Sequence, residues 1–151
     1  MATYDYYKLQ QGSIPNVRPG SNWFHIRVDF TLQPAAQDDI YKLCEVKNHW
    51  IVKSGFFRPT IDTGTATAAW TTGTTSAGTE LSSTNNCSTA TDTWIRFDTV
   101  DDDGPVALTA DGYLYGQVIT AKAETGMIDL MIEIVVAPGD EDRVDSLAEA
   151  N

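Results

Sequence analysis

The sequence predicts an all-β protein: an antiparallel β-sandwich, jelly-roll-like, with an extended N-terminal arm. Three observations lead to this class. Hydrophobic and polar residues alternate along several segments, which is the period of a strand with one buried face. Turn residues separate about seven or eight such segments, and no long segment has helical periodicity. The chain has 151 residues, 42% of them hydrophobic, which is enough for one domain with its own core.

Residues 1–21 are expected to form the arm. Pro15 and Pro19 fix the backbone and each lacks an N–H donor, which disfavours a helix. Three tyrosines in this segment are costly to leave in water, so the arm either frays or docks on a neighbouring subunit. The candidate contact residues are Tyr4, Tyr6, Tyr7, Ile14, Val17 and Arg18.

The next three segments are predicted strands. Residues 22–32 alternate most clearly, with Phe24, Ile26, Val28, Phe30 and Leu32 on one face and His25, Arg27, Asp29 and Thr31 on the other. Residues 40–46 are predicted to place Ile40, Cys44 and Val46 on one strand face, although a short helix is an alternative. Residues 50–61 favour a third strand, in which Gly55 marks a bulge or bend and Pro59 indicates a sheet edge.

A stretch rich in Thr, Ser, Ala and Gly (residues 63–84) resembles a linker in composition. Segments of ordinary strand composition follow it, however, so one folded domain is the better interpretation. β-branched threonines favour a strand at 65–70, followed by a loop at 72–79. The predicted organisation is an arm at 1–21, a β-sandwich domain at 22–138 and an acidic C-terminal tail at 139–151.

The remaining strands are predicted at 91–100, 112–123 and 126–138. In the first, Trp94 and Arg96 oppose Ile95 and Phe97, and the DDDGP segment after it is expected to be a turn. The last two are expected to form a hairpin through the AETG loop, since a short loop containing glycine is typical of hairpins. In the final segment Ile128, Leu130, Ile132, Ile134 and Val136 share one face.

Charge and composition exclude several classes of function. A net charge of -11 disfavours binding to nucleic acid or to an anionic membrane, both of which need clustered Lys and Arg. No secretory signal and no apolar run of membrane-spanning length is expected. Cys44 and Cys87 are too few for a disulfide scaffold and are predicted to be free thiols, consistent with synthesis in a reducing cytoplasm.

Candidate sites for chemistry are weak, so the sequence predicts no enzyme, no cofactor and no metal. His49 follows Cys44 at a spacing that some metal sites tolerate, but zinc needs more ligands than these two. The acidic loop at Asp98, Asp101 and Asp103 is an alternative calcium site, although it lacks the carboxylates of an EF-hand. The four tryptophans are interpreted as core residues of a small sandwich, with sugar stacking as the alternative.

The order of motifs resembles the capsid decoration, or cement, proteins of tailed phages. The likeness lies in "TGTATAAW" within residues 38–73 and in "LTADGYLYGQVITAKAETGMIDLMIEIVVA" at 108–137. It implies a non-enzymatic β-sandwich, often a homotrimer, on the outer surface of a phage head. There it would bind the major capsid protein and hold neighbouring subunits together. Two alternatives stay open: a carbohydrate-binding or adhesin module of a fibre or knob, and a neck or tail component of the virion.

Overall fold

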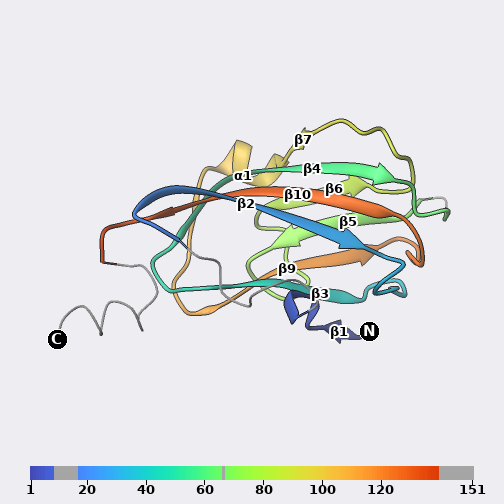
Figure 1. Ribbon diagram of the computed structural model, residues 1–151, viewed down its shortest axis with the longest axis horizontal. Helices are drawn as coiled ribbons and strands as arrows, with labels where there is room; N and C mark the ends of the chain where they lie inside the picture. The colour runs from blue at the N-terminus through green and yellow to red at the C-terminus, as the bar shows by residue number, and fades with distance from the viewer. Residues whose placement is uncertain (9–16, 66, 140–151) are drawn as a thin grey trace.

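The computed structural model describes residues 1–8, 17–65 and 67–139, which form two five-stranded sheets packed face to face (Figure 1). The first sheet contains β1 (Thr3–Tyr4), β3 (Ile40–Val46), β9 (Gly112–Ile119), β5 (Ala69–Gly73) and β6 (Ser82–Asn86), in that order. The second contains β2 (Gly20–Asp29), β10 (Met127–Val136), β4 (Ile51–Ile61) and β7 (Ile95–Arg96), with β8 (Val106–Ala107) also paired to β4. A 3-10 helix η1 (Tyr6–Lys8) and a short helix α1 (Asp98–Asp103) complete the fold.

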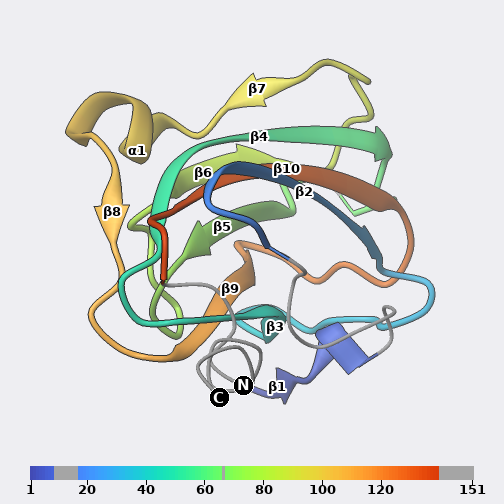
Figure 2. The same cartoon turned by 60° about the vertical axis from the view of Figure 1, so that its left-hand side comes forward.

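The chain crosses between the two sheets at almost every connection (Figure 2). From β2 to β5 each strand lies in the opposite sheet from the one before it, and only β5 and β6 form a local pair. The resulting orders, β3–β9–β5–β6 and β2–β10–β4–β7, are those of a double-sheet jelly roll. The predicted all-β sandwich is therefore confirmed.

The core fills the space between the two sheets. Alternate residues of β10 point into it, and Ile128, Leu130, Ile132 and Ile134 have no exposed surface. At its centre the Tyr41 ring lies 5.5 Å from that of Trp70. The Trp70 ring lies against Gly116 of β9, where any Cβ would come within 1.8 Å of the indole. This aromatic contact therefore requires glycine at position 116.

The predicted hairpin between the last two strands is wrong. β9 pairs with β3 and β5 in the first sheet, whereas β10 pairs with β2 and β4 in the second. The connection spans the sandwich instead, held by a bridge between Ala35 and Ala123. A glycine-containing loop suits a hairpin locally, but here both edges of each strand are taken by partners distant in sequence.

The strand predicted at 65–70 lies too early in the chain. β5 begins at Ala69, and Thr67 has a positive φ of 72° in the preceding turn. The strand continues through Gly73 and so includes the first two residues of the segment predicted as a loop, 72–79. Trp70 and Thr72 are both fully buried. The polar strand β6 was not predicted; it pairs with β5 and buries Ser82 completely.

Two strands were predicted correctly but differ in detail. In β3 the core residues are Tyr41, Leu43 and Val46, because a bulge between Lys42 and Cys44 shifts the alternation that the sequence suggested. In β4 the pairing with β10 is irregular at Lys53 and at Thr60, so Gly55 marks no bulge and instead makes room for the Phe97 ring.

Two further expectations concern the region around β4 and β7. The expected edge strand at Pro59 is wrong: β4 lies between β10 and the short strands β7 and β8, and Asp92 N donates to the Pro59 carbonyl at 3.0 Å. The proline is tolerated because β7 and β8 pair with β4 at other residues, so neither needs an N–H from Pro59. The strand predicted at 91–100 is reduced to the two residues of β7, and the expected DDDGP turn is largely helix α1. Buried Phe97 and Val100 anchor this helix to the sandwich.

Candidate functional site

The four tryptophans divide into two pairs. Trp50 and Trp70 are fully buried, as the core interpretation predicts, whereas Trp23 and Trp94 are 47% and 39% exposed. The exposed pair lies on the outer face of the second sheet, on β2 and just before β7. Large aromatic side chains left in water on a sheet face mark a candidate interaction surface.

Strand register places three rows of side chains on this outer face. The inward neighbours Ile26 and Val28 are buried, so the alternate positions of β2 point outward. Read from β2 across the sheet, the rows are Trp23–Glu133–Ser54, His25–Met131–Phe56–Arg96 and Arg27–Asp129–Arg58. The face thus combines residues from four strands that are far apart in the sequence.

Four apolar side chains enclose a shallow depression of about 350 Å³ on this face: Trp23, Phe56, Trp94 and Met131. We call these four residues the tryptophan patch. Trp23 and Phe56 stack with their ring centroids 6.0 Å apart and an interplanar angle of 28°. The stacking fixes one wall of the depression.

Arginines extend over the aromatic rings of the patch. The guanidinium carbon of Arg58 lies 4.4 Å from the Trp94 ring centroid, and that of Arg96 lies 5.7 Å from the Phe56 centroid. Both distances are within the range of cation–π attraction. Arg96 also forms an exposed ion pair of 2.6 Å with Asp101. Arg58 is likewise paired, with Asp92 at 3.6 Å and with Asp129 at 3.2 Å. The depression is therefore lined by apolar side chains, and the arginines beside it form ion pairs within the chain.

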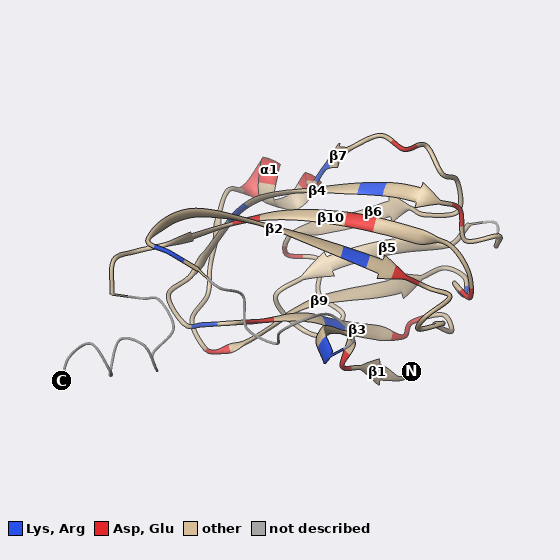
Figure 3. Cartoon of the chain, viewed as in Figure 1, with Lys and Arg blue, Asp and Glu red and all other residues tan. Residues whose placement is uncertain are grey.

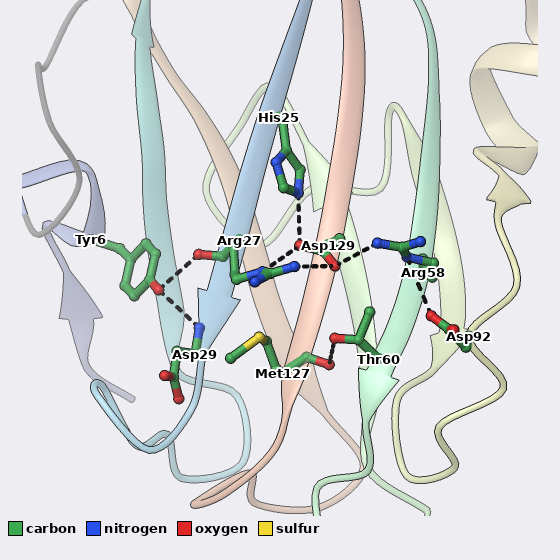
Figure 4. A network of polar contacts seen from close by, with 9 residues as sticks. All are labelled: Tyr6, His25, Arg27, Asp29, Arg58, Thr60, Asp92, Met127 and Asp129. Atoms are coloured by element: carbon green, nitrogen blue, oxygen red, sulfur yellow. Dashed lines mark hydrogen bonds and ion pairs between the residues drawn. The ribbon is translucent and has the colours of Figure 1, made fainter.

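Asp129 organises the cations next to the patch (Figure 4). Its side chain has no exposed surface, and its carboxylate accepts hydrogen bonds from Arg27 Nε at 2.8 Å and Arg58 Nη2 at 3.2 Å, with His25 Nε2 at 2.7 Å. Burial raises the pKa of Asp129, but these hydrogen bonds lower it by more, so the pKa lies below its ordinary value. The ionised carboxylate fixes both arginines in place.

The outer face of the second sheet is polar around Glu133, in the row Trp23–Glu133–Ser54. Glu133 accepts hydrogen bonds from Ser21 Oγ at 2.5 Å and Ser54 Oγ at 2.9 Å. These hydrogen bonds, with the one from Ser21 the larger cause, lower the pKa of Glu133. Figure 3 shows that arginines and acidic residues alternate across the strands of this sheet.

The outer face of the first sheet also carries aromatic residues, but the chain's own N-terminal segment covers part of it. The Tyr7 ring lies 5.3 Å from that of Tyr113, and Lys42 Nζ lies 4.6 Å above Tyr113. The segment is held to β3 by Asp39, which accepts hydrogen bonds from Ala2 N at 2.6 Å and Tyr4 Oη at 2.8 Å.

Tyr6 closes the free edge of β2. Its hydroxyl donates to the Arg27 carbonyl at 2.9 Å and accepts from Asp29 N at 2.8 Å (Figure 4). The Tyr6 ring packs edge-on against Tyr41 in the core, with 5.5 Å between centroids. The hydroxyl thus satisfies backbone groups that an added strand would otherwise pair with.

The candidate contact residues of the arm are thus placed as follows. Tyr6, Tyr7 and Val17 are buried within this chain, Tyr4 is half-buried, and Arg18 is exposed. Ile14 lies outside the described residues, as does nearly all of the predicted acidic tail. Contact of these residues with a neighbouring subunit stays a prediction, as does the division of the chain at residue 21.

The tryptophan patch was not predicted as a unit. Trp23, His25 and Arg27 alternate on one side of the first predicted strand, and Trp94 and Arg96 on one side of a later one. This alternation places the aromatic and basic residues on one side of each strand. It does not show that the two strands lie in the same sheet.

Within residues 1–8, 17–65 and 67–139, no group of three His, Cys, Asp or Glu side chains is arranged to hold a metal ion. In the acidic segment, Asp98 accepts hydrogen bonds from Ser83, and Asp101 pairs with Arg96.

Burial raises the pKa of the free thiols Cys44 and Cys87 to about 12. None of the described helices is long and apolar enough to span a membrane.

The fold and this surface define a small jelly-roll protein with an exposed aromatic patch on one sheet, and chains of similar fold occur in phage capsids. A chain of the Ralstonia phage GP4 capsid aligns with a TM-score of 0.60 and 15% identity, over 87% of this chain and 94% of that one. A chain of the cyanophage Pam1 capsid asymmetric unit aligns with a TM-score of 0.59 and 17% identity, over 84% and 94%. These similarities show a shared fold over nearly the whole of each chain. No protein-family model and no curated protein matches the sequence.

Proposed function

We propose that this protein is a structural component of a tailed-phage virion that decorates the head. In this role it binds the outer capsid surface and stabilises contacts between major capsid protein subunits. The observation that supports the proposal is the two-way coverage of the capsid chains: each is a single sandwich about as long as this one, with little left over. The sequence resemblance to decoration proteins points the same way.

The physical properties of the chain fit an adhesive role. A net charge of -11 disfavours association with the packaged nucleic acid and keeps particles apart. The exposed tryptophans and their arginines offer a contact surface rather than a reactive centre, and the proposed role involves no chemical step. We propose a homotrimer, because several modest contacts made by linked subunits strengthen binding by about 10²–10⁴-fold where the geometry allows.

Two alternative roles are tested by the same experiment on purified particles. Exposed Trp23 and Trp94 favour a carbohydrate-binding module as a second candidate, because aromatic rings stack on sugar faces. A neck or tail component has the same adhesive requirements as a head protein. Location and copy number in the particle distinguish it from a decoration protein.

Cryo-microscopy of purified particles tests the proposed function. We expect density of this fold on the outer head surface, repeated over the icosahedral lattice and seated over contacts between major capsid protein subunits. Heads assembled without the protein are expected to lose this density and to open at lower temperature. Density confined to one vertex would assign a neck or tail role, and density confined to fibres together with binding on a glycan array would assign a carbohydrate-binding role.

A further inference from the structure

Strand β2 leaves most of one edge without a partner. Within the described residues it pairs only with β10, over all ten of its residues. Tyr6 shows which backbone groups face away from β10, because its hydroxyl contacts the Arg27 carbonyl and the Asp29 N–H (Figure 4). Backbone groups alternate in direction along a strand, so every second residue before Arg27 turns its N–H and C=O to the same open side. These residues are Ser21, Trp23 and His25.

The open edge lacks the features that keep edge strands apart. Natural sheets protect an edge with lysine, proline, a bulge or an inward-pointing charge. Residues 21–26 read SNWFHI, contain none of these residues and pair with β10 without a register shift. Trp23 is 47% exposed on the outer side of the strand, and Phe24 on the inner side is half-buried. The edge of β3, by contrast, is covered by the chain's own β1. The β2 edge is therefore suited to pairing with a strand from outside the chain.

The open segment is limited at both ends. At one end the Tyr6 hydroxyl already donates to the Arg27 carbonyl. At the other end Gly20 has a positive φ of 100°, and Asn22 Nδ2 donates to the Arg18 carbonyl at 2.8 Å, which holds a turn at the start of β2. A strand that pairs here must therefore be short and must end before it reaches the Tyr6 contact.

The β2 strand of a second copy meets the first of these requirements. When two copies of one strand pair antiparallel across a two-fold axis, residues equally distant from the axis lie opposite each other. Trp23 is the middle one of the three open residues. With Trp23 on the axis, Ser21 of each copy lies opposite His25 of the other, so all three residues exchange backbone hydrogen bonds. Aromatic residues directly opposite each other, as the two Trp23 rings would be, are a favourable cross-strand pair.

The same register meets the second requirement. Gly20 of the second copy lies opposite Ile26, so the turn before β2 takes that chain away one residue short of the Tyr6 contact at Arg27. Arg27 would lie opposite uncharged Pro19, so no two like charges face each other across the axis. The open edge is thus complementary to itself in length, in backbone groups and in charge.

We propose that β2 pairs with β2 of a second copy, antiparallel and across a two-fold axis at Trp23. The contact joins the β2–β10–β4–β7 sheets of two copies into one continuous sheet. By itself it makes a dimer, and in a protein that is also a trimer it joins two trimers. The inference goes beyond the proposed function and does not depend on it, because the pairing needs no capsid.

Sedimentation equilibrium of the full chain over a range of concentrations tests the pairing. Trp23→Lys removes the ring on the axis and places two like charges opposite each other. Its matched control, Trp94→Lys, makes the same change at an exposed tryptophan of the same sheet face that lies just before β7, away from the β2 edge. Thermal unfolding shows that both variants are folded before their masses are compared.

We expect the wild type to double in mass as its concentration rises. Trp23→Lys is expected to raise the dissociation constant of this step by about tenfold or more, since a central tryptophan carries much of the energy of an interface. Trp94→Lys should associate as the wild type does. A wild type that keeps one mass throughout, or a folded Trp23→Lys that associates equally well, overturns the inference and leaves the proposed function standing.

A cysteine on the axis tests the register directly. Cα atoms of residues opposite each other in a hydrogen-bonded antiparallel pair are about 5.5 Å apart, which a disulfide can span. Trp23→Cys should therefore form a disulfide-linked dimer on oxidation. Leu32→Cys is the control, because position 32 is 60% exposed but lies beyond the end of β2, far from the axis, and should stay unlinked. Equal cross-linking of the two variants overturns the register.

Other outcomes assign the surface to other occupants. Equal loss of association in Trp23→Lys and Trp94→Lys assigns the contact between copies to the tryptophan patch rather than to the strand edge. A wild type that keeps one mass in solution, but needs Trp23 and not Trp94 to co-sediment with heads, assigns the edge to an extended segment of a capsid protein. Either result overturns pairing of β2 with its own copy.

Discussion

The outer faces of the two sheets carry similar chemistry but differ in what covers them. Both have aromatic rings with a cation above them: Lys42 over Tyr113 on the first sheet and Arg58 over Trp94 on the second. On the first, the N-terminal segment packs Tyr7 onto Tyr113. On the second, no described segment covers Trp94, which is 39% exposed. An aromatic residue on a sheet face therefore indicates a partner surface only if no segment of the same chain covers it.

This contrast separates two uses of aromatic residues in the same fold. Tyr6 and Tyr7 contribute to folding, because their surface is removed from water within the chain. Trp23 and Trp94 leave much of theirs in water, which gives a surface available to a partner. The comparison predicts that substitutions on the covered side lower stability, whereas substitutions on the open side mainly change attachment.

The largest expected effect is at Tyr6. Tyr6→Ala removes a buried ring from the core and exposes the β2 edge, so we expect the free energy of unfolding to fall by about 3–5 kcal/mol. Urea unfolding followed by tryptophan fluorescence measures it. Tyr6→Phe keeps the ring and loses only the hydroxyl contacts to Arg27 and Asp29, and should cost about 1–2 kcal/mol. Equal stability of Tyr6→Ala and wild type would show that the segment does not stabilise the sandwich.

An intermediate effect is expected at Asp129. Asp129→Asn removes the charge that both arginines contact, and we expect a loss of about 2 kcal/mol at neutral pH. Because the folded-state pKa of Asp129 lies below its ordinary value of 3.8, its stabilising contribution is present above that pH and is lost as the pH falls through the lower, folded-state value.

Unfolding measured as a function of pH checks this sign. Wild-type stability should fall with acidification in that range, and Asp129→Asn should fall less steeply. Parallel curves for the two proteins would mean that the Asp129 carboxylate is not held by the arginines in solution.

The smallest effect on stability is expected on the open side. Trp94→Ala removes a half-exposed ring that contacts Arg58, so thermal unfolding should report a loss of about 1 kcal/mol or less. The matched comparison is Trp70→Ala, whose ring is fully buried and should cost about 3–5 kcal/mol. A loss of stability at Trp94 as large as that at Trp70 would show that the Trp94 ring contributes to folding as a core residue does, contrary to the comparison.

Alternation along single strands could be predicted from the sequence. The buried rows of β2 and β10 follow the predicted pattern because a strand with one wet face must alternate. In β3 the same rule was right for Val46 but missed Tyr41 and Leu43, because one bulge after Lys42 changes which alternate residues face the core. In β5 burial on both sides of the strand left no alternation to detect.

Pairing between distant strands could not be predicted in this way. The row Arg27–Asp129–Arg58 joins residues more than 70 positions apart along the chain, and no local pattern marks them as neighbours. For the same reason the tyrosines of the arm were expected to contact another subunit. Their burial in this chain depends on β3 and β9 lying beside them.

The position of β10 has a consequence for synthesis. It lies between β2 and β4, so until the segment ending at Val136 has been made β2 has no strand partner in its sheet and β4 has only the two-residue strands β7 and β8. During translation the second sheet therefore stays incomplete, because its two longest early strands, β2 and β4, cannot yet be joined through β10. Such late, long-range closure slows folding and exposes the nascent chain to aggregation. Emergence of β10, rather than of the first strands, should set when assembly-competent protein first appears in the cell.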